Sequence, residues 1–239
     1  MSIRLDLILI ALGVAAHAAA ARPNPSSHPQ ITEVLFNVPS DAAGDANMDG
    51  ERHAAGDEFV EIANPHPAPI NLRGYVLFNR RASFDGHEGS GVRFEFPDFE
   101  LPAHGVCVVF NACDASIPGP LGTTRKPPES GNDSFNGAAV FSMENSSSGR
   151  ALANGGDWIA LASPDGTIID CVSWGEPKPP PPTGALRSQK VDANPKGSVQ
   201  RLTPTGELLP HRQVNGEPFS PGVIPTRTNA LKNPKKSKK

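Results

Sequence analysis

Oxygen-bearing side chains alternate along one short stretch of this sequence, residues 45–50. Asp45, Asn47 and Asp49 occupy positions 1, 3 and 5 of the stretch, and Gly50 follows at position 6. A hard cation needs this arrangement, because alternate residues of a tight loop converge on one point while glycine takes the sharp bend. The spacing therefore predicts a loop that binds Ca²⁺ as a structural ion.

The predicted ligand set extends a little beyond these positions. It comprises the side-chain oxygens of Asp45, Asn47 and Asp49, the backbone carbonyl of Glu51 and the carboxylate of Asp57. A helix–loop–helix calcium site has Glu at position 12, whereas Gly56 stands there in this chain. The alternative is a solvated loop rich in Gly and Asp that holds no ion.

Residues that would support catalysis are not grouped in the sequence. The chain has no Gly-x-Ser-x-Gly motif, no glycine-rich phosphate loop and no Cys-x-x-Cys pair. Glu58 and Glu61 stand three apart in a predicted strand, so they should face opposite sides and cannot work as an acid–base pair. His53 is interpreted as a solvated loop residue, since a hard cation does not favour imidazole. We predict no catalytic residues, no bound organic cofactor and no enzymatic activity.

Turn-forming residues set the expected fold class. The 239 residues include 26 Pro and 23 Gly, and no long segment has apolar positions at helical spacing. Short apolar or alternating runs indicate eight or nine strands, at residues 31–38, 59–63, 73–78, 92–96, 106–110, 138–143, 157–162, 167–174 and 198–202. This pattern predicts an all-β sandwich with long Pro/Gly-rich loops, although a jelly roll has similar spacing.

Two connections in this predicted fold are unusually long or proline-rich. Residues 111–136 carry Gly, Pro, Ser and charged residues, and such a loop either has a function or is mobile. Residues 177–182 contain five prolines, which indicates an extended surface spacer or, alternatively, a ligand for an aromatic groove.

The two ends of the chain differ from the middle. Residues 1–20 have a basic start, an apolar run and small residues at a cleavage position, which predicts a cleaved secretory signal, no transmembrane segment in the mature chain and a secreted or periplasmic location. Residues 21–29 are a predicted linker, 30–225 one domain and 226–239 a disordered basic tail. Five lysines at 232–239 contribute +5 to the formal net charge of −3, so the rest of the chain sums to −8. The tail either attracts anionic polymers such as nucleic acid or is simply solvated.

The cysteine count leaves their state open. The chain has three cysteines, Cys107, Cys113 and Cys171, so at most one internal disulfide can form. Either a bridge involves Cys171, or all three are small buried hydrophobic residues. Their spacing with histidine does not indicate zinc.

Several short motifs, in order, resemble the lamin-tail domain family. They are Ile31-Thr32-Glu33-Val34, Asp57-Glu58-Phe59-Val60-Glu61-Ile62, Asn71-Leu72-Arg73-Gly74-Tyr75, Leu101-Pro102-Ala103-His104-Gly105, Asn154-Gly155-Gly156-Asp157-Trp158 and Asp165-Gly166-Thr167. The calcium-type insert and Ser220-Pro221-Gly222 are similar to those of bacterial secreted members. The resemblance covers about residues 29–225, and it departs from the family at Tyr75, where Trp is common. It implies an immunoglobulin-like β-sandwich that binds proteins, nucleic acid or membrane-associated partners without catalysis.

Three functional hypotheses follow. The preferred one is a secreted, non-catalytic binding or cell-surface structural module whose partner is a protein or a cell-surface polymer. The second is a secreted hydrolase of nuclease type, or its accessory, with a site in residues 111–136 or around the acidic loop. The third is a protein that binds anionic polymers through its lysine tail.

Overall fold

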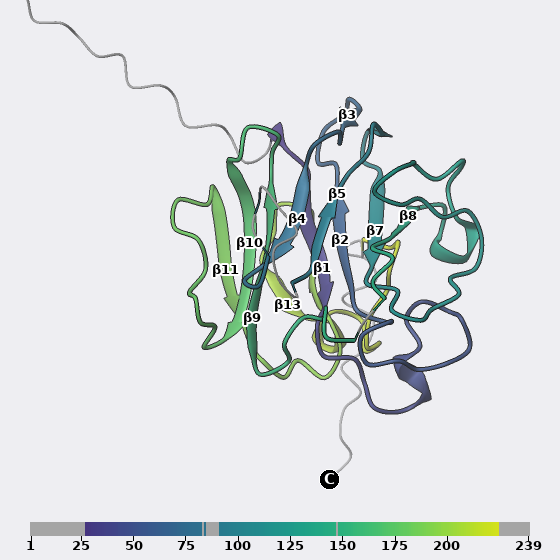
Figure 1. Ribbon diagram of the computed structural model, residues 1–239, viewed down its shortest axis with the longest axis vertical. Coiled ribbons are helices and arrows are strands. Elements are labelled where there is room, and N and C mark those ends of the chain that lie inside the picture. Colours follow the sequence, from purple (N-terminus) through teal and green to yellow (C-terminus); the bar gives the residue numbers. More distant parts are fainter. Residues whose placement is uncertain (1–26, 83, 85–90, 147, 225–239) are drawn as a thin grey trace, which may run out of the picture.

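The computed structural model describes residues 27–82, 84, 91–146 and 148–224. The predicted signal at 1–20, most of the predicted linker at 21–29 and the predicted basic tail at 226–239 lie outside these ranges. Within them the chain is built almost entirely from strands (Figure 1). The expectation of an all-β immunoglobulin-like sandwich is confirmed.

Six strands form the first sheet, in the order β13-β12-β1-β2-β7-β8. Their bounds are β1 (Gln30–Leu35), β2 (Phe59–Ala63), β7 (Val106–Phe110), β8 (Ala139–Ser142), β12 (Val199–Arg201) and β13 (Leu208–Pro210). The four-residue helix α1 (His211–Val214) follows β13 directly. Short 3₁₀ turns, η2 (Ala42–Gly44) and η3 (Asp133–Phe135), lie in the connections.

Five strands form the second sheet, in the order β11-β10-β9-β4-β5. They are β4 (Val76–Asn79), β5 (Arg93–Glu95), β9 (Gly156–Ala162), β10 (Ile168–Gly175) and β11 (Arg187–Val191). The two-residue strands β3 (Ile70–Asn71) and β6 (Glu100–Leu101) pair separately. A turn through Asp165 and Gly166 joins β9 to β10, as the Asp-Gly pair predicts, with Gly166 at φ +82°.

The core lies between the two sheets because each strand turns its apolar side chains toward the other sheet. One continuous cluster contains Val60, Ile62 and Val109 from the first sheet together with Leu161 and Trp174 from the second. The Trp174 ring stacks on Phe36 with the ring centroids 3.9 Å apart, and both side chains are fully buried. These contacts make the two sheets one packed unit.

A buried ion pair also connects the two sheets. Arg201 of β12 contacts Asp170 of β10 at 3.0 Å, and neither side chain is exposed to solvent. The same Asp170 carboxylate accepts a hydrogen bond from the backbone N–H of Ile31 in β1. The pair therefore joins three strands that are far apart in the sequence.

Parallel pairing explains the two long connections. β7 lies parallel to β8, and β10 lies parallel to β11. Parallel neighbours require a crossover of a dozen or more residues, because the chain must return to the starting end of the sheet. Residues 111–138 make the first crossover, and residues 176–186, which include the proline-rich stretch, make the second.

The first crossover lies beside β7 and β8 (Figure 1). Its Ile117, Phe135 and Ala138 pack against Phe59 and Phe110 in a second buried cluster. Asn132 fixes the crossover, because its side-chain amide donates to the carbonyls of Pro118 and Pro120. This segment is thus an integral part of the fold.

The described residues contain 13 strands rather than the eight or nine predicted. The additional ones are the two-residue pair β3 and β6, the edge strand β11 and β13, none of which has a clear apolar alternation. The predicted strand at 73–78 starts later, at Val76, because the Tyr75 N–H bonds to the Leu72 carbonyl in a turn. The strand predicted at 31–38 ends at Leu35, where pairing with β2 stops.

All three cysteines are free and buried. The interpretation of small buried hydrophobic residues is therefore correct, and the bridge involving Cys171 does not form. Burial raises the pKa of the Cys171 thiol to about 12, so this residue stays in the neutral form.

Candidate functional site

The predicted calcium loop is folded by its own side chains. Asp45 Oδ2 accepts from the backbone N–H of Gly50 at 3.0 Å, and Asn47 Oδ1 accepts from that of Asp49 at 3.0 Å. Asp49 Oδ1 accepts from the N–H of Glu51 at 2.9 Å. Gly50 has φ +91°, which L side chains rarely adopt. The alternate spacing therefore produces the tight bend that the sequence predicts.

Asp57 lies on the inner side of this loop and is fully buried. Its Oδ1 accepts from the N–H groups of Ala46 at 2.7 Å and Asn47 at 3.0 Å, and its Oδ2 accepts from His53 at 2.6 Å. Burial raises the pKa of Asp57, although these three hydrogen bonds favour the ionised form. Asp57 thus connects the two ends of the loop.

Two polar atoms of the loop are buried without a hydrogen-bond partner in the described structure: Asp45 Oδ1 and Asn47 Nδ2. A buried carboxylate oxygen without a donor is costly, and a cation beside it would remove that cost. The Asn47 amide nitrogen is a donor, so a cation would leave it unsatisfied. Glu51 is exposed, and its N–H already donates to Asp49.

The acidic loop is attached to the first crossover. The Ser116 N–H donates to Asp49 Oδ2 at 3.3 Å, and the Ala112 N–H donates to the Gly56 carbonyl at 3.1 Å. A Cβ atom at Gly56 would lie only 2.7 Å from the Cys113 carbonyl oxygen. Glycine is therefore required where the two segments meet.

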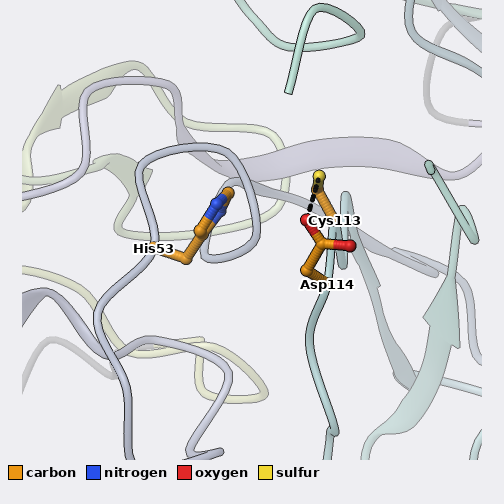
Figure 2. A group of neighbouring side chains, drawn as sticks. All are labelled: His53, Cys113 and Asp114. Atoms are coloured by element: carbon orange, nitrogen blue, oxygen red, sulfur yellow. Dashed lines mark hydrogen bonds between the residues drawn. The ribbon is translucent and has the colours of Figure 1, made fainter. Parts of the chain in front are cut away.

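This junction brings together His53, Cys113 and Asp114 (Figure 2). Their ligand atoms lie within 4.8 Å of one another, a property that Asp45, Asp49 and Asp57 do not share as a group. The Cys113 thiol donates to Asp114 Oδ2 at 3.5 Å, and its pKa is raised by burial and by Asp114. Since residues 53 and 113 are far apart in the sequence, their spacing gave no signal of this contact.

The tautomer of His53, set by its hydrogen bonds, argues against a metal at this junction. Its Nδ1 accepts the N–H of Gly56 at 2.8 Å and that of Ala55 at 3.3 Å. These bonds place the ring proton on Nε2, so neither nitrogen has a free lone pair for a metal. The three residues form a polar contact between two loops.

Comparison with known families agrees with this architecture. The sequence profile described as Lamin Tail Domain matches residues 22–176, which is more than half of the chain. The chain belongs to the lamin tail domain family. No curated protein matched it. Lamin tail domains are non-enzymatic immunoglobulin-like β domains with binding or structural roles.

Both sheets of this lamin tail domain protein include strands that lie after the matched region. β11 pairs with β10, and β12 pairs with β1, so residues after 176 complete both sheets. No helix in the described part of the chain is long and apolar enough to cross a membrane.

The structure also reveals a buried polar cluster that the sequence analysis did not identify. Glu33 of β1 and Glu61 of β2 stand directly opposite each other, and both are fully buried. Glu58, by contrast, accepts hydrogen bonds from Asn111 and from the Leu152 N–H and has no partner in common with Glu61 among the described contacts. A glutamate amid apolar strand residues was the available signal for the Glu33–Glu61 cluster.

Proposed function

We propose that this lamin tail domain is an exported, non-catalytic binding module whose acidic loop is stabilised by Ca²⁺. The partner class is a protein or a cell-surface polymer, as the binding and structural roles of the family suggest. The observation that carries the calcium proposal is the buried Asp45 Oδ1 atom without a partner, in a loop with calcium-type spacing.

The proposed ligands are the side chains of Asp45, Asn47 and Asp49 and the backbone carbonyl of Glu51. The three side-chain oxygens that bond to loop N–H groups each accept only one such bond, which leaves a lone pair for a hard cation. Asp57 belongs to the same unit: its Oδ1 accepts two backbone N–H bonds and holds the loop in shape, whereas its Oδ2 accepts only that of His53 and keeps a lone pair for the ion.

Removal of calcium is expected to lower the melting temperature. A site occupied at one hundred times its dissociation constant adds about 2.7 kcal/mol to the free energy of unfolding. For a domain of this size, that corresponds to roughly 5–10 °C. Thermal melts with Ca²⁺ and with a chelator would measure the shift.

Two variants test whether the calcium-dependent shift in melting temperature depends on Asp45. Asp45→Asn should reduce the calcium-dependent shift, because it removes the ligand charge at position 1. Asp41→Asn changes an exposed aspartate just before the loop and should leave the shift intact. Equal melting temperatures with Ca²⁺ and chelator in the unaltered protein would contradict the calcium proposal.

Export through a cleaved signal predicts a mature chain that lacks the first residues. The basic start and apolar run of residues 1–20 support cleavage by signal peptidase. Sequencing the N-terminus of protein recovered from expressing bacterial cells should show a first residue close to position 21. Mature protein that keeps Met1 would contradict export through a cleaved signal.

A further inference from the structure

The carboxyl groups of Glu33 and Glu61 lie beneath the last part of the described chain. Glu33 and Glu61 are cross-strand partners on the outer face of the first sheet, and neither has any exposed surface. Glu33 Oε2 has no hydrogen-bond partner in the described structure. Like charges directly opposite on neighbouring strands repel each other, and burial strengthens the repulsion.

Residues 211–223, the closing segment, lie over these carboxyl groups. The Ser220 N–H donates to Glu33 Oε1 at 3.0 Å, and the Gly222 N–H donates to Glu61 Oε2 at 2.9 Å. The sheet contributes further donors, since Ser198 Oγ bonds to Glu33 and Thr32 Oγ1 bonds to Glu61. The closing segment is thus attached to the sheet through both glutamates.

Glycine is required at the second attachment point. Gly222 has φ +88°, and a Cβ atom there would lie 2.2 Å from the Phe135 carbonyl oxygen. The closing segment therefore touches the first crossover as well as the sheet. A side chain at position 222 would push the segment away from both.

A neutral histidine completes the cluster. His211 Nδ1 is 2.8 Å from the Glu217 carbonyl oxygen, to which it donates, so Nε2 accepts from the Ser220 hydroxyl at 2.8 Å. His211 Nε2 is 3.9 Å from Glu33 Oε1. Burial lowers the pKa of His211, and Arg212 lowers it further, whereas the hydrogen bond and charge of Glu217 raise it; the net direction is downward.

The two glutamates hold their protons more tightly than exposed carboxyl groups do. Burial raises the pKa of Glu61 to about 7. Burial, followed by the charge of Glu61, raises the pKa of Glu33 well above its usual value. The Cys107 thiol near Glu61 is neutral, because burial and Glu61 raise its pKa. No cation among these groups balances two ionised carboxylates.

We propose that the closing segment is a pH-sensitive latch, held shut while Glu33 and Glu61 are protonated and released when both carboxyl groups ionise. Release would uncover the outer face of the first sheet around the two glutamates.

The pH range in which the latch opens follows from the difference in carboxyl pKa between its closed and open states. In the open latch the carboxyl groups are solvated and titrate near the ordinary value of 4.5, whereas closed Glu61 titrates at about 7. A raised pKa stabilises the closed state fully below pH 4.5, and this stabilisation is lost as pH rises to about 7. His211 acts in the opposite sense below the ordinary histidine value of 6.5, because burial lowers its pKa, but it is one group against two.

Amide hydrogen exchange tests this latch directly. After correction for intrinsic exchange rates, the protection of the Ser220 and Gly222 amides should fall by about 100-fold between pH 5 and pH 8. The Ile159 amide in β9 is the internal reference and should stay protected. Parallel loss at Ile159 would indicate global unfolding and would overturn the latch, as would constant protection at Ser220 and Gly222.

Matched variants separate the carboxyl groups from the rest of the fold. The double change Glu33→Gln and Glu61→Gln removes both titrations and should make Ser220 protection independent of pH. Glu176→Gln alters an exposed carboxyl group paired with Lys190 and should behave like the parent protein. Gly222→Ala should expose the segment at every pH. A double variant that keeps the original pH dependence would overturn the proposal.

A measurement on the unaltered protein covers the case in which the double variant does not fold. Carboxyl ¹³C resonances report the ionisation of each glutamate by NMR. Glu61 should titrate at about 7 in the folded protein. Titration of both Glu33 and Glu61 at ordinary carboxyl values would overturn the latch.

Discussion

Replacement of Arg201 by methionine is expected to lower the free energy of unfolding by about 3–5 kcal/mol, because it leaves the buried carboxylate of Asp170 without its partner. Both side chains are fully buried, and Arg201 also donates to the carbonyls of Ile31 and Gly206. Urea denaturation monitored by circular dichroism would measure the loss.

The pKa shifts of this pair indicate how stability should change when both charged residues are replaced together. Burial raises the pKa of Asp170 and lowers that of Arg201, so desolvation outweighs the attraction between them. The double variant Arg201→Met with Asp170→Leu should therefore recover much of the lost stability. Arg73→Met is the control, since it removes an exposed contact with Asp98 and should cost less than about 1 kcal/mol. A single Arg201 variant as stable as this control would contradict the expectation.

Replacement of Asp57 by alanine is expected to have the second large effect, a loss of roughly 3–5 kcal/mol together with weaker calcium binding. The change leaves the N–H groups of Ala46, Asn47 and His53 without their acceptor. Each buried unsatisfied group costs about 1–3 kcal/mol, and the three costs are not fully additive. Urea denaturation and calcium titration calorimetry would measure both consequences.

Asp57→Asn provides a finer comparison at the same position. The asparagine oxygen can still accept from Ala46 and Asn47, but its NH₂ group would face the His53 N–H, so an intermediate loss is expected. Asp49→Asn, at a part-exposed position, should weaken calcium binding with a much smaller effect on the calcium-free protein. An Asp57→Ala protein as stable as the parent would show that the loop does not depend on this carboxylate.

Much of the sheet structure could be predicted because burial leaves a local signature. β2 and β7 have the predicted bounds, since both are apolar runs ended by turn residues. β11 has the sequence Arg-Ser-Gln-Lys-Val and is an edge strand, so hydrophobic periodicity could not reveal it. Strand pairing over long sequence separations, such as β7 with β8, has no local signal at all.

The candidate sites likewise differ in whether a local sequence pattern marks them. The acidic loop could be found because its pattern depends on six adjacent residues. The Glu33–Glu61 cluster had only a weak signal, a glutamate amid apolar strand residues, and a lone glutamate in a strand normally faces solvent. Here the covering residues come from positions 198–222, which no spacing rule connects to position 33.

The pairing of β1 with β12 governs the order in which the protein can be assembled. β12 emerges from the ribosome some 165 residues after β1, so β1 has an open edge during most of synthesis. Such distant partners also slow folding, because a large loop must close before their contact forms. The first sheet therefore stays incomplete until β12 has been synthesised.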